Sequence, residues 1–188
     1  MKRINIDHPD AMKEALLALV DNKVIAYPTD TSYGSGTDLE NIEGIEKINV
    51  LKNREAPMSI IVHNFEEIAE KLIIPSQFRN QMTNIIKNGD TCIVEYKSDA
   101  FSEIITKDNK IGFRVPNYSF LTKLLSLYKK PITTTSINTT GQEPLNNPDK
   151  IEEMFGNDID LILDAGTIKN KSASKIYIFD KDNVSQIR

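Results

Sequence analysis

At 188 residues, with 39% hydrophobic and 27% charged content, the sequence predicts one compact domain over residues 1–188 with its own hydrophobic core. Its formal net charge of −4 argues against general nucleic-acid binding, and its single cysteine excludes an internal disulfide and a zinc site of several thiolates. No apolar run approaches transmembrane length and the amino end lacks an apolar signal core, so we expect a cytoplasmic protein without a membrane partner.

Helical and strand patterns alternate along the chain. Ala11, Ala15 and Leu19 recur at helical spacing, whereas the short apolar run at 24–27 is typical of a buried strand. In chain order the patterns predict a strand at 3–6, helix at 9–21, strand at 24–27, helix from 42 ending before Lys52, strand at 58–62, helices at 65–72 and 78–86, strands at 91–96 and 110–115, helix at 120–128, strand at 132–135, helix at 151–155 and strands at 161–163 and 175–179. Because several strands follow one another late in the chain, we expect an α/β fold with a mixed sheet.

The most informative segment is the polar run from Thr133 to Gly141. Seven of its nine side chains carry a hydroxyl or a carboxamide. Such groups bury little apolar area and compete with regular backbone pairing, so the run suits a ligand surface. Ser136 and Asn138, at i and i+2, would point to one side of a strand end. The alternative interpretation is a turn that these two side chains cap.

A second polar segment, residues 29–36, follows the predicted strand at 24–27. Its glycines are spaced for close backbone approach to a ligand, but it lacks the Gly-Lys-Ser/Thr of a Walker A loop. It is not a Rossmann fingerprint either, since Leu39 occupies the position of the third glycine. The segment is therefore either a ligand loop or a plain turn from a strand to a helix.

A basic pair, Lys52 and Arg54, is expected just past a helix end. Residues at i and i+2 do not share one face of a regular helix. In an extended segment they could project together, as a point charge beside a planar fork suited to phosphate oxygens. The alternative is two solvated charges at the end of a helix.

Three further side chains are candidates for structural or functional roles. Arg114 is a charge within an apolar strand, so it requires either a structural carboxylate or a ligand as its partner. His63 closes the predicted strand at 58–62, where a histidine is either a capping residue or a site residue. Cys92 lies within a strand pattern and is expected to fill the core.

Taken in order, these segments resemble the YrdC/TsaC family of threonylcarbamoyl-AMP synthases. The matching segments are Tyr27-Pro28-Thr29-Asp30-Thr31-Ser32-Tyr33-Gly34, Lys52-Asn53-Arg54, Ile60-Ile61-Val62-His63, Gly112-Phe113-Arg114-Val115-Pro116, Thr135-Ser136-Ile137-Asn138-Thr139-Thr140-Gly141, Leu163-Asp164-Ala165-Gly166 and Ser172-Ala173-Ser174. They span residues 24–188. The resemblance implies the short, single-domain form of a YrdC-like α/β fold, with a twisted, mixed, largely open sheet flanked by helices and a concave ligand cavity.

The resemblance also implies an activity. The expected enzyme is a nucleotidyltransferase, an L-threonylcarbamoyladenylate synthase, which condenses L-threonine, bicarbonate (or CO2) and ATP to threonylcarbamoyl-AMP and pyrophosphate. The product feeds a threonylcarbamoyl-transferase complex that modifies an adenosine in tRNAs. Mg2+ is the expected cofactor, bridging phosphate oxygens of ATP, although no protein ligand for it can be named. A contact with tRNA or double-stranded RNA is a further implied partner.

Site residues carried over from the family fall into two sets. The set expected to bind ATP is Lys52, Arg54, Asn138 and Arg188. The set expected to bind threonine is Thr31, His63, Arg114, Ser136 and Ser174, with Arg114 facing the threonine carboxylate. The expected catalytic residues are Lys52, Arg54, Ser136 and Asn138.

Two departures from the family pattern keep other functions open. Glu55 stands where proline usually follows Lys-x-Arg, and Met58 stands where a polar residue that can touch nucleotide is common. They are compatible with a YciO-like paralogue of different or weaker activity. A non-catalytic RNA-binding module of the same fold is the other alternative, against which the acidic net charge weighs.

Overall fold

The computed structural model describes residues 1–53, 57–169 and 173–188, and eleven strands within these ranges form one sheet. The strand order is β1-β9-β2-β3-β8-β4-β7-β6-β10-β11, with β5 pairing β6 off this path. The strands are β1 (Lys2–Asn5), β2 (Ile25–Pro28), β3 (Tyr33–Gly36), β4 (Ser59–Ile61), β5 (Leu72–Ile73), β6 (Thr91–Tyr96), β7 (Lys110–Arg114), β8 (Ile132–Ser136), β9 (Leu161–Asp164), β10 (Ile176–Phe179) and β11 (Val184–Gln186). Parallel pairs such as β4–β7 adjoin antiparallel pairs such as β4–β8, which confirms the mixed, open sheet.

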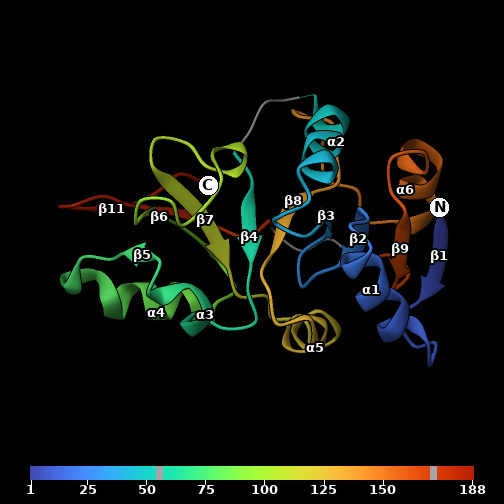
Figure 1. The fold of residues 1–188 in the computed structure, drawn as a ribbon, viewed down its shortest axis with the longest axis horizontal. Helices are drawn as coiled ribbons and strands as arrows, with labels where there is room; N and C mark the ends of the chain where they lie inside the picture. The colour runs from blue at the N-terminus through green and yellow to red at the C-terminus, as the bar shows by residue number, and fades with distance from the viewer. Residues whose placement is uncertain (54–56, 170–172) are drawn as a thin grey trace.

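Helices lie on both sides of this sheet. They are α1 (Ala11–Val20), α2 (Ile42–Lys52), α3 (Glu66–Ala69), α4 (Arg79–Lys87), α5 (Ser119–Tyr128) and α6 (Pro148–Phe155), with 3-10 turns η1 (Ser76–Phe78) and η2 (Glu103–Ile105). In Figure 1, α1, α3, α4 and α5 follow one side, α2 and α6 the other, and β11 and β1 lie at opposite ends of the molecule. No helix among the described residues is long and apolar enough to cross a membrane.

Two hydrophobic clusters hold these layers together. The smaller one packs α1 and α5 on the sheet through fully buried side chains such as Leu19, Leu125 and Tyr27. The larger one includes Ile48 of α2, Phe113 of β7 and side chains of α4 and α6. The helical and strand periodicities of the sequence therefore correspond to the apolar faces that meet in the core.

The prediction that residues 29–36 form one loop is wrong. Only residues 29–32 are a loop, because residues 33–36 form β3, which pairs with β2 on one side and β8 on the other. The glycines serve strand packing here: a Cβ at Gly36 would lie 2.0 Å from the backbone oxygen of Thr133. At Gly34 a Cβ would lie 2.9 Å from the ring of Tyr27.

Two predicted helix boundaries also differ from the structure. Lys52 is the last residue of α2 rather than a residue beyond it, and the left-handed Asn53 (φ 50°) ends the helix. The helix expected at 65–72 is only α3, because Leu72 and Ile73 leave it to pair with β6 as β5. In both cases a local backbone change, a left-handed residue or a strand pairing, decides where the helix ends.

Candidate active site

A cavity of about 270 Å³ opens where β3, β4, β6, β7 and β8 meet the segment before β10. Hydroxyl and guanidinium groups dominate its polar lining. The lining residues are Thr29, Thr31, Ser32, Tyr33, Gly34, Pro57, Ser59, Thr91, Ile93, Arg114, Thr134, Thr135, Ser136, Pro144, Ala173, Ser174, Ile176 and Arg188. Five predicted site residues are among them, namely Thr31, Arg114, Ser136, Ser174 and Arg188.

The loop between β2 and β3 contributes three hydroxyl residues to the cavity lining, Thr29, Thr31 and Ser32. Thr29 organises this loop. Its Oγ1 accepts hydrogen bonds from the backbone N–H groups of Thr31 (3.1 Å) and Ser32 (3.2 Å) and donates to the Ser32 carbonyl at 2.7 Å. A Thr side chain that closes a short turn in this way fixes the loop without any ligand.

Arg114, the last residue of β7, lines the cavity although it is only 8% exposed. Its Nη2 donates to Asp30 Oδ2 at 2.7 Å, and its Nε donates to the carbonyl of Gly89. The partner that the sequence required for this buried charge is therefore a carboxylate from the β2–β3 loop. Since a guanidinium has five N–H donors, this pairing uses only part of its capacity.

Arg188 brings a second guanidinium to the same cavity. Its Nε donates to the Ser174 carbonyl at 3.0 Å, and its Nη2 to Ser174 Oγ at 3.4 Å. Burial, followed by the proximity of the Arg114 guanidinium, lowers the pKa of Arg188. Two cations that repel each other across one cavity favour an anionic ligand between them.

Lys52, Ser136 and Asn138 form one hydrogen-bonded unit at the end of β8. The Lys52 ammonium, in a residue only 3% exposed, donates to the carbonyls of Ser136 (2.7 Å) and Asn138 (3.1 Å) and to Asn138 Oδ1 (2.7 Å). Ser136 Oγ also donates to that Oδ1 at 2.7 Å. Thr140 completes the contact, because its N–H and its hydroxyl both donate to the Lys52 carbonyl. Lys52 of the basic pair thus meets the polar run, as expected, but neither Lys52 nor Asn138 is among the described residues that line the cavity.

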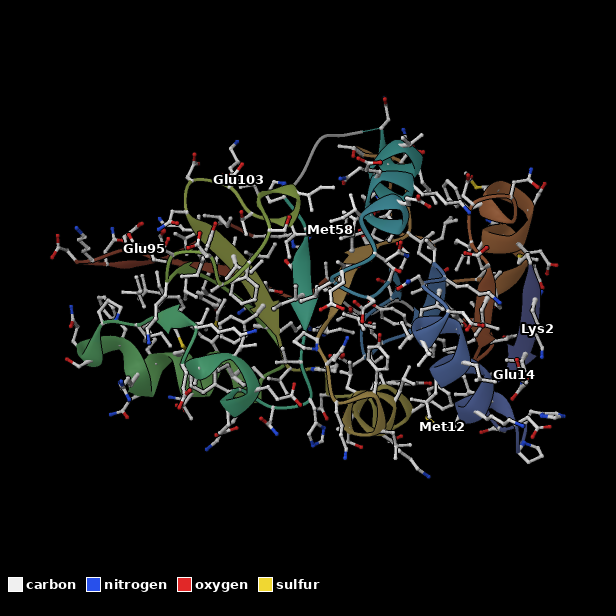
Figure 2. All side chains as sticks on the ribbon, viewed as in Figure 1. Lys2, Met12, Glu14, Met58, Glu95 and Glu103 are labelled. Carbon is white, nitrogen blue, oxygen red and sulfur yellow. The ribbon has the colours of Figure 1, made fainter. Side chains whose placement is uncertain are left out.

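The remaining predicted residues differ in their placement. Arg54 lies outside the described residues. His63 is not among the described residues that line the cavity; its backbone N–H donates to Glu67 Oε2 at 3.1 Å, and its Nδ1 is buried without a described partner. Met58, labelled in Figure 2, is 1% exposed and belongs to the larger core cluster rather than to the cavity lining.

Two polar lining residues, Ser59 and Thr91, were not predicted, and neither was the pairing of Asp30 with Arg114 beside the cavity. Thr134 also lines the cavity and belongs to the polar run that was expected to form a ligand surface. A polar residue at the end of an apolar strand was the available signal for Ser59 and Thr91. In the described ranges, no group of three or more His, Cys, Asp or Glu side chains gathers where it could hold a metal ion.

The fold and cavity together define an α/β protein with a cationic, hydroxyl-lined pocket on an open mixed sheet. The family Sua5_yciO_yrdC, described as telomere recombination, matches residues 17–188. The chain therefore belongs to the Sua5/YciO/YrdC family.

Sequence relatives and solved structures agree with this assignment. A threonylcarbamoyl-AMP synthase of Photobacterium profundum is 28% identical over 93% of this chain and 97% of its own length. One from Vibrio campbellii is 29% identical over 87% of this chain and 91% of its own. E. coli YciO superposes with a TM-score of 0.87 at 22% identity, covering 100% of this chain and 93% of that one. P. abyssi Sua5 complexed with L-threonine superposes at 0.85 and 22% identity, with 100% of this chain covering 56% of that one.

Proposed function

We propose that this chain is an L-threonylcarbamoyladenylate synthase, a nucleotidyltransferase that makes threonylcarbamoyl-AMP and pyrophosphate from L-threonine, bicarbonate or CO2, and ATP. The observation that carries the proposal is the cavity itself, where two guanidinium groups and several hydroxyls converge beside the Lys52–Asn138 unit. The relatives named threonylcarbamoyl-AMP synthase, which match nearly their whole length, support the same activity.

The chemistry requires little covalent work from the protein. The threonine amine attacks CO2, or bicarbonate with loss of water, and forms a C–N bond as the nitrogen gives up a proton. An oxygen of the resulting carbamate then attacks the α-phosphorus of ATP, while the bond to pyrophosphate breaks. The protein has to hold anionic reactants together and stabilise the charge that develops on phosphate oxygens.

We assign the threonine side of the site to Arg114, Thr31, Ser136, Ser174 and His63. Arg114 has N–H donors beyond those used by Asp30 and Gly89, and guanidinium–carboxylate pairing suits the threonine carboxylate. The hydroxyls of Thr31, Ser136 and Ser174 lie around the same cavity and are suited to the polar groups of a small amino acid.

We assign the ATP side to Lys52, Arg54, Asn138 and Arg188. Lys52 and Asn138 act there as one hydrogen-bonded unit, and Arg188 is a cation without a described carboxylate partner. Mg2+ is usually bound through one or two carboxylates, waters and substrate phosphates, so we expect it to arrive with the triphosphate. The adenylate would then pass to a threonylcarbamoyl-transferase complex that acts on tRNA.

The test is pyrophosphate release by the purified chain with ATP and Mg2+. The proposal predicts release that depends on both L-threonine and bicarbonate, with threonylcarbamoyl-AMP detected by mass spectrometry. Pyrophosphate release that does not depend on threonine, or no release at all, would contradict the proposal.

A YciO-like paralogue is the second candidate, because E. coli YciO has the same fold over 93% of its length. The two are distinguished in cells that lack their own threonylcarbamoyl-AMP synthase. Rescue of growth by this chain supports the synthase, and failure by a well-expressed chain supports the paralogue. If the chain is instead an RNA-binding module, tRNA will shift in a gel and Lys52→Ala will not alter the shift.

A further inference from the structure

The carboxylate of Asp30 holds Arg114 from behind the cavity lining. Asp30 lies in the β2–β3 loop, between the cavity-lining residues Thr29 and Thr31, but is not itself among the described lining residues. Its Oδ2 accepts from Arg114 Nη2 at 2.7 Å. Its Oδ1 is buried and has no described hydrogen-bond partner. Among the described residues, Arg114 is therefore the only cation that forms an ion pair with this carboxylate.

The pair is enclosed as well as bonded. The exposed fractions of the two side chains are 9% for Arg114 and 19% for Asp30. Gly89, with φ at +73°, covers them: its carbonyl accepts from Arg114 Nε, and a Cβ there would lie 3.2 Å from Asp30 Oδ2. A guanidinium held at two donors by a carboxylate and a carbonyl is restricted in both rotation and translation.

We infer that Asp30 is the positioning residue for Arg114, acting through the guanidinium and making no contact with substrate. The carboxylate ties the end of β7 to the loop that presents Thr31 and Ser32, so it sets the distance between two sides of the pocket. It also offsets the positive charge that Arg114 and Arg188 concentrate in one cavity. This inference rests on the proposed function for its substrate, since Arg114 there receives the threonine carboxylate.

Asp30→Asn keeps the size of the side chain and removes its charge. We expect the KM for threonine to rise roughly tenfold to a hundredfold, as when a charge-assisted bond that orients a binding group is lost. The kcat and the KM for ATP should stay near their wild-type values, because the ATP side is built from other residues. Asp38→Asn is the matched control: Asp38 is a carboxylate only 3% exposed that binds the Tyr128 hydroxyl, away from the cavity lining. It should lower thermal stability and leave the KM for threonine unchanged.

A double-mutant cycle separates positioning from a general structural effect. In an Arg114→Met background, Asp30→Asn should no longer change threonine affinity measured by calorimetry. The same added substitution should raise the melting temperature of Arg114→Met, because it removes a buried carboxylate that has lost its cation. Additive effects on both readouts, or an unchanged KM in Asp30→Asn alone, would overturn the inference.

The two readouts also distinguish this inference from the proposed function. If the wild-type chain forms no threonylcarbamoyl-AMP, the proposed function fails, yet the melting temperatures of the cycle still test the dependence of Asp30 on Arg114. If Arg114→Met does not fold, Asp30→Asn still reports through the Nη2–H NMR signal of Arg114, because Nη2 is the atom that donates to Asp30. That signal should shift and exchange faster with water when the carboxylate is gone, and an unchanged signal would contradict the inference.

Discussion

Individual buried polar groups shape this site, and Lys52 is a buried cation held by several of them. Its ammonium, with three N–H donors, meets three oxygens of Ser136 and Asn138. It therefore shapes the polar turn after β8 as well as supplying a positive charge. The sequence motif indicates the charge, but only the folded chain reveals this structural role.

Lys52→Met should lower both stability and activity. Buried acceptors that lose their donor cost about 1–3 kcal/mol, so the free energy of unfolding in urea should fall by that order. The rate of pyrophosphate release should fall by about 10²–10³, as for loss of a donor directed at developing charge. Lys87→Met is the matched control, since Lys87 is also the last residue of a helix, α4, but is exposed. A Lys52→Met protein with wild-type rate would contradict the assignment.

Because the thiol of Cys92 is buried, we expect the free energy of unfolding to depend on pH. Burial foremost, and the nearby Asp90 carboxylate, raise the pKa of its thiol from an ordinary value near 9 to about 12. The folded state thus keeps a proton that the unfolded state loses above pH 9. This contribution to stability is complete below pH 9 and is lost as the pH rises from 9 towards 12, by up to about 1.4 kcal/mol per pH unit.

The measurement is the free energy of unfolding at about pH 9 and about pH 10 for the wild type and Cys92→Ala. The variant should be less stable overall, because it leaves a small cavity, but its stability should decline less steeply with pH. If the stability of the two proteins declines equally with pH, the thiol has the same pKa in the folded and unfolded states, which would contradict the prediction.

At the scale of elements, strand β3 joins the loop that follows β2 to the polar end of β8. It lies between β2 and β8, and its register sets Gly34 opposite Ser136. The tetrapeptide Tyr33-Gly34-Ser35-Gly36 lacks the β-branched residues typical of strands, so its sequence is more typical of a loop. Glycine was nevertheless required, because backbone atoms of β8 approach too closely for a side chain at Gly36.

Gly36→Ala should therefore destabilise the fold and the site together. The new Cβ would lie 2.0 Å from the backbone oxygen of Thr133, so β3 and β8 must move apart. We expect a loss of about 1–3 kcal/mol in the free energy of unfolding, as in an overpacked core, with weaker threonine binding. Ser35→Ala in the same strand is the control. Its buried hydroxyl has no described partner, so removing it should be neutral or stabilising.

How well the sequence predicts a feature of the structure depends on how far apart in the chain the interacting residues lie. Periodic apolar residues, such as those of α1 and α5, predicted their helices because the signal is local. The pairing of Arg114 with Asp30 joins residues 84 positions apart, so no spacing rule could indicate it. The short strands β5 and β11, of two and three residues, depend on their neighbours in the sheet and carry little signal of their own.

For the whole molecule, the cavity exists only after the sheet has assembled. Its walls come from the loop after β2 and from β4, β6, β7, β8 and the β10 segment, which together span most of the sequence. Four of the family segments contribute lining residues although they are far apart in the chain: Thr29 to Gly34, Arg114, Thr135 with Ser136, and Ala173 with Ser174. Lys52 and Asn138 are hydrogen-bonded to Ser136 but are not among the described lining residues. The proposed activity requires such a pocket to hold an amino acid and a nucleotide close enough to react.

The most direct measurement is a crystal structure with L-threonine and a non-hydrolysable ATP analogue bound together. We expect the threonine carboxylate on Arg114 and the phosphates towards Lys52, Arg54 and Arg188, within the one cavity. Threonine bound elsewhere, or a nucleotide that leaves Lys52 and Arg188 untouched, would contradict it.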